Sequence, residues 1–360
     1  MRISQALLLA ILLITLAVHS VRADFIISTD SDYGGYARRI ARDGSQKVSY
    51  ELDGLVHDFE TMGTTHAATP DGTIVYVFTN TLGHSNHIFA FNAKTGAHLP
   101  AATLHSGFLS PADPEDQIIQ ARQALIRPVD PLAVGDLFVI SDHSEIKRYK
   151  RSTNSYVETI SPPTSQAVYD FAFGPNNWLH MAGADGIIPY REFITGLSTA
   201  EFEIANPIFP TITLATGSIA FGPDGLLYLR DLASGNVDRY TVTGVPLGTF
   251  IPASAIADPA SVDPLLMAGR GSIQFGPDGH LYLFQHGNNT IGRFSGATGE
   301  LKSTTPYSTA SGQAAYGRIT VFPVPEPATA MLLVSACGVA IARRNRGVTI
   351  LSHVSKQPTI

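Results

Sequence analysis

The chain has 360 residues, of which 15% are charged, whereas roughly a quarter of the residues in a typical globular domain are charged. Its net charge of −6 argues against a nucleic-acid partner, which would require a basic face. With 32 glycines and 23 prolines between short apolar runs, the composition favours an exported all-β domain.

The N-terminus has the features of a cleavable secretory signal. A basic start precedes an apolar stretch from Ala6 to Val18, and the small residues Val21 and Ala23 stand at the −3 and −1 positions of a cleavage site. The apolar stretch is shorter than the roughly 20 residues that span a bilayer. We therefore expect residues 1–23 to form a signal peptide that is cut after Ala23.

The mature chain, residues 24–323, opens with three predicted strands and then enters a repeat. The opening strands are expected over residues 25–29, 37–41 and 47–52, and no inner strand of the kind found in the repeat precedes them.

Three copies of one pattern define the repeat. They read FAFGPNNWLH over 171–180, IAFGPDGLLY over 219–228 and IQFGPDGHLY over 273–282. Each copy predicts a strand, a tight turn and a second strand. Pro-Asp-Gly supplies the fixed φ, the side-chain cap and the residue with positive φ that such a turn needs.

A third strand ends in an aromatic residue before another turn, and a fourth strand follows it, as over 248–251. The third strands are predicted over 87–91, 145–149, 236–240 and 290–294. Four antiparallel strands repeating roughly every 45 to 55 residues are typical of propeller blades. Five units are predicted to begin near Thr65, Ala124, Val168, Ser218 and Ser272. The repeated aromatic residues are expected to pack in the core rather than to form a sugar platform; they are Phe91, Tyr149, Tyr240 and Phe294, with Trp178 beside them.

The strand that closes the ring is predicted at the far end. Residues 317–323 mirror the inner strand over 217–223, so they would become the innermost strand of the first blade. The predicted fold is therefore an all-β propeller of six four-stranded blades, closed by the C-terminal strand. Five or seven blades, or an extended β-sandwich array, are the alternatives. The insert over 108–127, in which Asp113 or Asp116 could cap a short helix, is expected to decorate one face.

The C-terminal segment has three parts in a fixed order. A proline-rich stretch comes first, an apolar run over 330–342 follows, and three arginines close it. The motif residues are Val324, Pro325, Glu326 and Pro327, and the arginines are Arg343, Arg344 and Arg346.

This order resembles the PEP-CTERM signal that exosortases recognise. The resemblance implies that residues 324–346 form a sorting signal with a transmembrane helix, which anchors the chain transiently. An exosortase-type processing enzyme would then cut near the motif, delivering the protein to the cell surface or matrix. Such signals usually stop at the arginines, so the tail over 347–360 is a departure from the pattern; a plain C-terminal anchor is the alternative. The single cysteine, Cys337, lies in the apolar run, so the processed chain would contain none.

The last two predicted blades resemble NHL-repeat propellers and the related streptogramin-lyase and gluconolactonase-like groups, on the residues of 275–282 and 287–294. The resemblance implies that ligands meet the channel where inner strands start and where second strands lead into third strands. The candidates for a divalent metal such as Zn²⁺ or Ca²⁺ are Asp142, His143, Asp170 and His286, with His66, Asp185 and Asp231 nearby. A bound metal could polarise a carbonyl or activate water. The alternative, which we favour, is that these residues only cap turns.

Two functions follow. The first is a non-catalytic surface or matrix protein that binds extracellular polysaccharide or a surface protein. The second is a metal-dependent lactonase or lyase that uses His143, His286 and Asp170. We favour the first, and assign no catalytic residue, because the sequence has no HExxH zinc pair, P-loop or nucleophile elbow.

Overall fold

A computed structural model describes the strands of the repeat and most of their turns. The described residues are 22–29, 36–41, 43, 45–51, 65–78, 88–103, 124–127, 135–141, 144–153, 155–162, 167–175, 177–183, 186–195, 199–204, 216–231, 234–256, 272–285, 290–306 and 319–324. They belong almost entirely to one compact unit, Ala23–Pro323. The hydrophobic clusters seen in the described residues all lie within this unit, so it has the core of an independently folding domain.

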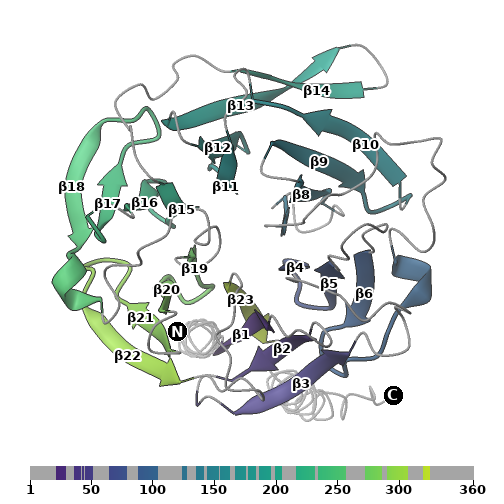
Figure 1. Cartoon of the computed structure of the whole chain (residues 1–360), viewed down its shortest axis with the longest axis horizontal. Coiled ribbons are helices and arrows are strands. Elements are labelled where there is room, and N and C mark those ends of the chain that lie inside the picture. Colours follow the sequence, from purple (N-terminus) through teal and green to yellow (C-terminus); the bar gives the residue numbers. More distant parts are fainter. Residues whose placement is uncertain are drawn as a thin grey trace, which may run out of the picture. The chain divides into compact units, whose positions relative to one another are not determined.

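The described strands form six sheets arranged around a common centre (Figure 1). The first sheet has the strand order β23 (Ile319–Val324), β1 (Arg22–Thr29), β2 (Tyr36–Ile40), β3 (Gln46–Glu51). The second contains β4 (Thr65–Ala68), β5 (Ile74–Phe78) and β6 (Ile88–Asn92). The third contains β7 (Ala124–Ile126), β8 (Leu137–Ser141), β9 (Glu145–Lys150) and β10 (Ser155–Ile160).

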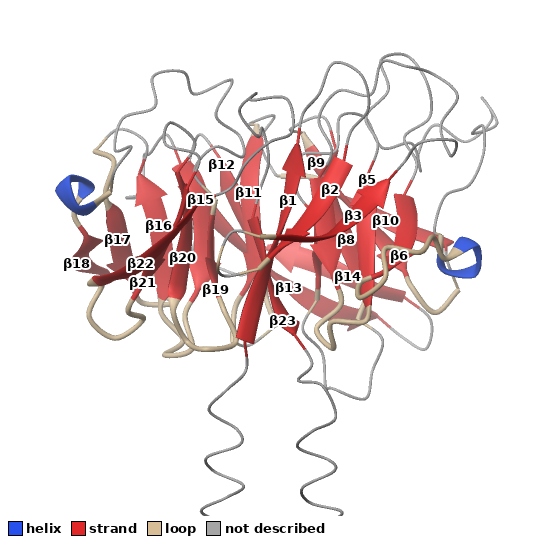
Figure 2. Ribbon diagram, turned by 90° about the horizontal axis from the view of Figure 1, so that it is seen from below, coloured by secondary structure: helices blue, strands red, loops and turns tan. Residues whose placement is uncertain are grey.

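The remaining three sheets follow the repeats. The fourth contains β11 (Val168–Phe173), β12 (Leu179–Gly183), β13 (Gly186–Thr195) and β14 (Thr199–Ile204). The fifth contains β15 (Thr216–Phe221), β16 (Leu227–Asp231), β17 (Val237–Tyr240) and β18 (Pro246–Ile251). The sixth contains β19 (Ile273–Phe275), β20 (Leu281–Gln285), β21 (Thr290–Phe294) and β22 (Leu301–Pro306). Two short 3₁₀ helices, η1 (Pro100–Ala102) and η3 (Ala253–Ala255), lie at the rim (Figure 2).

This architecture confirms the predicted all-β propeller. The predicted starts at Thr65, Ala124 and Val168 are the first residues of β4, β7 and β11. Five sheets have the predicted four strands, but the sheet of β4, β5 and β6 has three in the described part of the chain. After β6 the chain makes only an isolated bridge between Phe91 and His98, then turns into η1. The predicted insert, with Asp113 and Asp116, falls mainly on residues outside the described ranges.

The predicted closure is confirmed. Strand β23, from the far end of the chain, lies next to β1 and completes a four-stranded sheet. The pairing of β1 with β2 begins at Phe25, opposite Ile40, and runs to Thr29, opposite Tyr36. Cleavage after Ala23 would therefore leave these pairs intact.

The Pro-Asp-Gly turns have the predicted chemistry. Asp224 Oδ1 accepts a hydrogen bond from Leu226 N at 3.1 Å, and Asp224 Oδ2 accepts one from the Tyr228 hydroxyl at 2.8 Å. Asp278 repeats both bonds, with His280 N and Tyr282. The glycines Gly225 and Gly279 have φ of 76° and 72°, a conformation that glycine adopts without steric cost.

The phenylalanine before each Gly-Pro turn joins two blades. Its ring packs edge-on against the aromatic side chain on the second strand of the preceding sheet. The ring centroids are 5.0 Å apart for Phe173 and Phe138, 4.7 Å for Phe221 and His180, and 4.8 Å for Phe275 and Tyr228. The sequence repeat therefore encodes the contact between blades as well as the strands of each blade.

The aromatic residues predicted for the core divide into two groups. Phe91, Tyr149 and Phe294 are fully buried, as predicted. Tyr240 and Trp178 are partly exposed, because Tyr240 ends β17 and Trp178 lies in the turn before β12.

Within the described residues no helix is long and apolar enough to cross a membrane. Of the predicted signal peptide only Arg22 and Ala23 are described, and they are the first residues of β1. The rest of the signal peptide, the apolar run over 330–342 and the motif residues Pro325, Glu326 and Pro327 lie outside the described residues. Val324 is the last residue of β23.

Candidate functional site: the central channel

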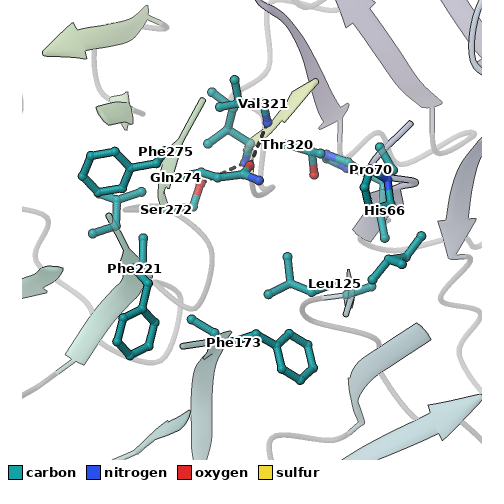
Figure 3. Close-up of a pocket in the computed structure, with 18 of the residues that line it drawn as sticks. His66, Pro70, Leu125, Phe173, Phe221, Ser272, Gln274, Phe275, Thr320 and Val321 are labelled. Carbon is teal, nitrogen blue, oxygen red and sulfur yellow. Dashed lines mark hydrogen bonds between the residues drawn. The ribbon is translucent and has the colours of Figure 1, made fainter. Parts of the chain in front are cut away.

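One cavity of about 350 Å³ lies among the innermost strands. Residues from β4, β7, β11, β15, β19 and β23 line it (Figure 3). The cavity extends to the C-terminal ends of these strands. Its lining includes Phe173, Phe221 and Phe275, which are the last residues of β11, β15 and β19. The channel is thus built from segments that are far apart in the sequence.

One residue from each innermost strand occupies an equivalent position along the cavity. We call this set the channel ring; it comprises Ala67, Leu125, Ala172, Ala220, Gln274 and Thr320. The first five stand opposite the same position of the neighbouring second strand, as in the pairs Ala172–His180 and Ala220–Tyr228. An amide and a hydroxyl stand on the adjacent strands β19 and β23, and three alanines leave open space around the rest of the ring.

The amide of Gln274 is fixed by the backbone of β23. Val321 N donates to Gln274 Oε1 at 2.7 Å (Figure 3). A backbone N–H can only donate, so Oε1 is the acceptor and Nε2 keeps both of its donors. Neither Nε2 nor the Thr320 hydroxyl has a hydrogen-bond partner within the described residues.

Among the described residues that line the cavity, His66 is the one titratable side chain. It is buried, with 1% of its surface exposed. Burial lowers the pKa of His66 to about 3, although a backbone hydrogen bond to Ile26 acts in the opposite direction. The imidazole is therefore neutral at physiological pH, and the described residues of the channel lining carry no charge.

Asp170, one of the predicted metal ligands, is fully buried and has a different role. Its Oδ1 accepts from Phe171 N at 2.6 Å, and its Oδ2 accepts from Ser218 Oγ at 2.6 Å and Ile219 N at 2.8 Å. Both oxygens are thus engaged, and the bonds to Ser218 and Ile219 join β11 to β15. Coordination of a metal would have to replace these bonds.

The other predicted metal ligands, Asp142, His143 and His286, lie outside the described residues, as does Asp185. Asp231 is buried and accepts from Ser234 N at 3.2 Å, so it caps its loop, as the alternative interpretation expects. Among the residues that the structure describes, no three His, Cys, Asp or Glu side chains gather into a metal-binding group.

The channel ring is not predictable from the sequence. The only available signal was the residue before the repeated phenylalanine, which is alanine in two copies of the repeat and glutamine in the third, Gln274. A single departure of this kind does not reveal that the position faces a cavity.

No protein-family model matches the chain, and no curated protein matches it. Solved structures with a similar backbone include virginiamycin B lyase from Staphylococcus aureus, at 17% identity and a TM-score of 0.40, over 73% of this chain and 70% of that one. The calcium-binding protein regucalcin from Agrobacterium tumefaciens has 15% identity and a TM-score of 0.42, over 68% and 73%. A chain of a nidogen/laminin complex has 10% identity and a TM-score of 0.48, over 83% and 98%. These similarities are too distant to assign an activity.

Proposed function

We propose that the chain is an exported cell-surface or extracellular-matrix propeller of six blades, which acts as a binding or scaffold protein. An exosortase-type enzyme releases it from a transient membrane anchor, and its partner is an extracellular polysaccharide or a surface protein. Six innermost strands around one cavity support the blade count. The order of motif, apolar run and arginines supports the export route.

The observation that carries the non-catalytic role is the hydrogen bonding of Asp170. Of Asp142, His143, Asp170 and His286, it alone lies in the described residues, and its carboxylate joins two blades. The alternative, a metal-dependent lactonase or lyase, would need this carboxylate at a metal together with His143 and His286.

Metal analysis separates the two functions. Residues 24–324 keep every described strand except the first two residues of β1. We expect this protein to contain no stoichiometric metal and to unfold at the same temperature with and without a chelator. One metal per chain that is lost in His143→Ala, together with hydrolysis of lactones, would establish the alternative instead.

Export is tested separately with the full-length chain in its native host. We expect the protein in the extracellular fraction and, after substitution of Pro325, Glu326 and Pro327 by alanine, in the membrane fraction. The three substituted residues lie outside the propeller strands and come directly after Val324, the last residue of β23. Equal release of both proteins would contradict the sorting role of the motif.

A further inference from the structure

We infer that the channel is a binding site for a small uncharged molecule with an apolar body and a carbonyl or ether oxygen, which Gln274 and Thr320 recognise. This site goes beyond the proposed surface partner and does not depend on the export route. It rests on the size of the cavity, its apolar wall and the two polar groups that face it.

The size of the cavity sets the class of ligand. Small-molecule pockets in proteins have volumes of roughly 300–1,000 Å³, and the channel cavity has about 350 Å³. It therefore suits one compact molecule, whereas a polysaccharide chain needs an extended groove.

The rest of the channel ring is apolar. Ala67, Ala172 and Ala220 contribute short side chains, and Leu125 extends into the same space (Figure 3). An apolar ring or short alkyl chain placed against these residues would be removed from water, which is favourable. The alanines are what leaves room for it, because a larger residue at the same position of the ring would fill the space.

The polar side offers directional hydrogen bonds. Since Val321 N occupies Gln274 Oε1, the amide presents its N–H groups to the cavity, and the Thr320 hydroxyl lies beside it (Figure 3). A carbonyl or ether oxygen could accept from both groups. Such a ligand would satisfy donors that otherwise have no partner within the described residues.

We expect an uncharged ligand because the described part of the lining holds no compensating charge. Among the described residues that line this cavity there is no Asp, Glu, Lys or Arg, and the buried imidazole of His66 is neutral. Transfer of an unpaired ion from water into such surroundings is strongly unfavourable. We therefore expect neutral molecules to bind and their anionic analogues to be rejected.

The probe is Prodan, a neutral naphthalene ketone whose fluorescence shifts to shorter wavelength in apolar surroundings. We expect saturable binding by residues 24–324 with one site per chain. Ala172→Leu should weaken binding at least tenfold. The substitution is compatible with the fold because β7 carries Leu125 at the same ring position. Ala220→Leu is a second variant of the same kind.

Gln274→Glu tests the polar side. The carboxylate still accepts from Val321 N, but it replaces the N–H donors by an oxygen that repels the ketone, so affinity should fall at least tenfold. Leu301→Ala, at an exposed position of β22, is the control and should bind Prodan like the unaltered protein. Thermal unfolding of each variant verifies that the ring is intact.

Three outcomes would overturn the inference. The first is the absence of saturable binding. The second is equal affinity in the unaltered protein, Ala172→Leu, Ala220→Leu and Gln274→Glu, which would place the probe on another surface. The third is equal binding of the anion 2-naphthoate at the same site, which would contradict the uncharged class.

Discussion

Ser218 connects three successive blades of the propeller. Its hydroxyl donates to Asp170 Oδ2 on β11 at 2.6 Å and accepts from Ile273 N on β19 at 3.1 Å. Ser272, at the equivalent position directly before β19, accepts from Ile319 N on β23 at 2.9 Å. Each blade is a separate sheet, and the described innermost strands of neighbouring blades do not pair through their backbones. These side chains therefore supply hydrogen bonds that join neighbouring innermost strands.

Replacement of Asp170 by asparagine should destabilise the protein strongly. The amide has only one accepting oxygen, and its NH₂ group would face donors that the carboxylate now satisfies. Hydrogen bonds to a buried charged group contribute about 1.5–3 kcal/mol each, so we expect the free energy of unfolding to fall by about 2–4 kcal/mol. Urea unfolding followed by the fluorescence of the single tryptophan, Trp178, measures this change.

The control for Asp170→Asn is Glu300→Gln. Glu300 is exposed and pairs with Lys302 at 2.6 Å, and exposed ion pairs contribute at most about 1 kcal/mol. If both variants lose the same small amount of stability, Asp170 does not join the blades in the way described.

Removal of β23 should open the ring. A chain that ends at residue 318 loses the bonds from Ile319 N to Ser272 and from Val321 N to Gln274. It also loses Ile319 and Val321 from the core cluster that contains Tyr282. We expect this chain to aggregate or to unfold without a cooperative transition, as seen by size-exclusion chromatography and calorimetry.

A chain that ends at residue 324 is the matched control, since it retains β23 complete. Equal melting temperatures of the two chains would show that the sheet of β1, β2 and β3 does not need its inner strand.

The sequence predicts the parts of the fold that depend on local chemistry. The Pro-Asp-Gly turns define the strand pairs, and the third strand predicted over 290–294 coincides with β21. Residues 317–323 resemble an inner strand, and every blade of a closed ring needs an inner strand. The sequence therefore also predicts that this segment closes the ring. The role of Asp170 could not be predicted, since its partner Ser218 lies 48 residues away. The cavity exists only once six strands meet, so small residues such as Ala172 give no signal in the sequence.

Lower pH should destabilise the protein through its buried histidines. Burial lowers the pKa of His180 to about 4, although a backbone hydrogen bond to Trp178 acts in the opposite direction. An unfolded chain binds this proton near pH 6.5, so between about pH 6.5 and pH 4 the unfolded state binds more protons than the folded state. Stability should therefore fall with falling pH, by at most ~1.4 kcal/mol per pH unit for one such group. His66 contributes in the same direction, down to about pH 3.

His180→Phe isolates this contribution. The equivalent position carries Phe138 on β8 and Tyr228 on β16, each packed edge-on against the next blade, so phenylalanine should fit against Phe221. Urea unfolding at several values between pH 7 and pH 4.5 should give a shallower pH dependence for the variant than for the unaltered protein. Parallel dependences would mean that His180 is not held neutral in the folded state.

Two glycines in contact should respond very differently to alanine. A Cβ atom on Gly296 would lie 1.9 Å from the backbone oxygen of Gly279, so the two turns would have to separate, and we expect a loss of about 3 kcal/mol or insoluble protein. Gly279 has a φ of 72°, but nothing lies within 4 Å of a Cβ there. Gly279→Ala should therefore lose only the roughly 1–2 kcal/mol of a left-handed backbone. Urea unfolding of both variants measures the difference. A larger loss for Gly279→Ala would mean that backbone conformation, rather than the close approach of the two turns, determines which residue these positions accept.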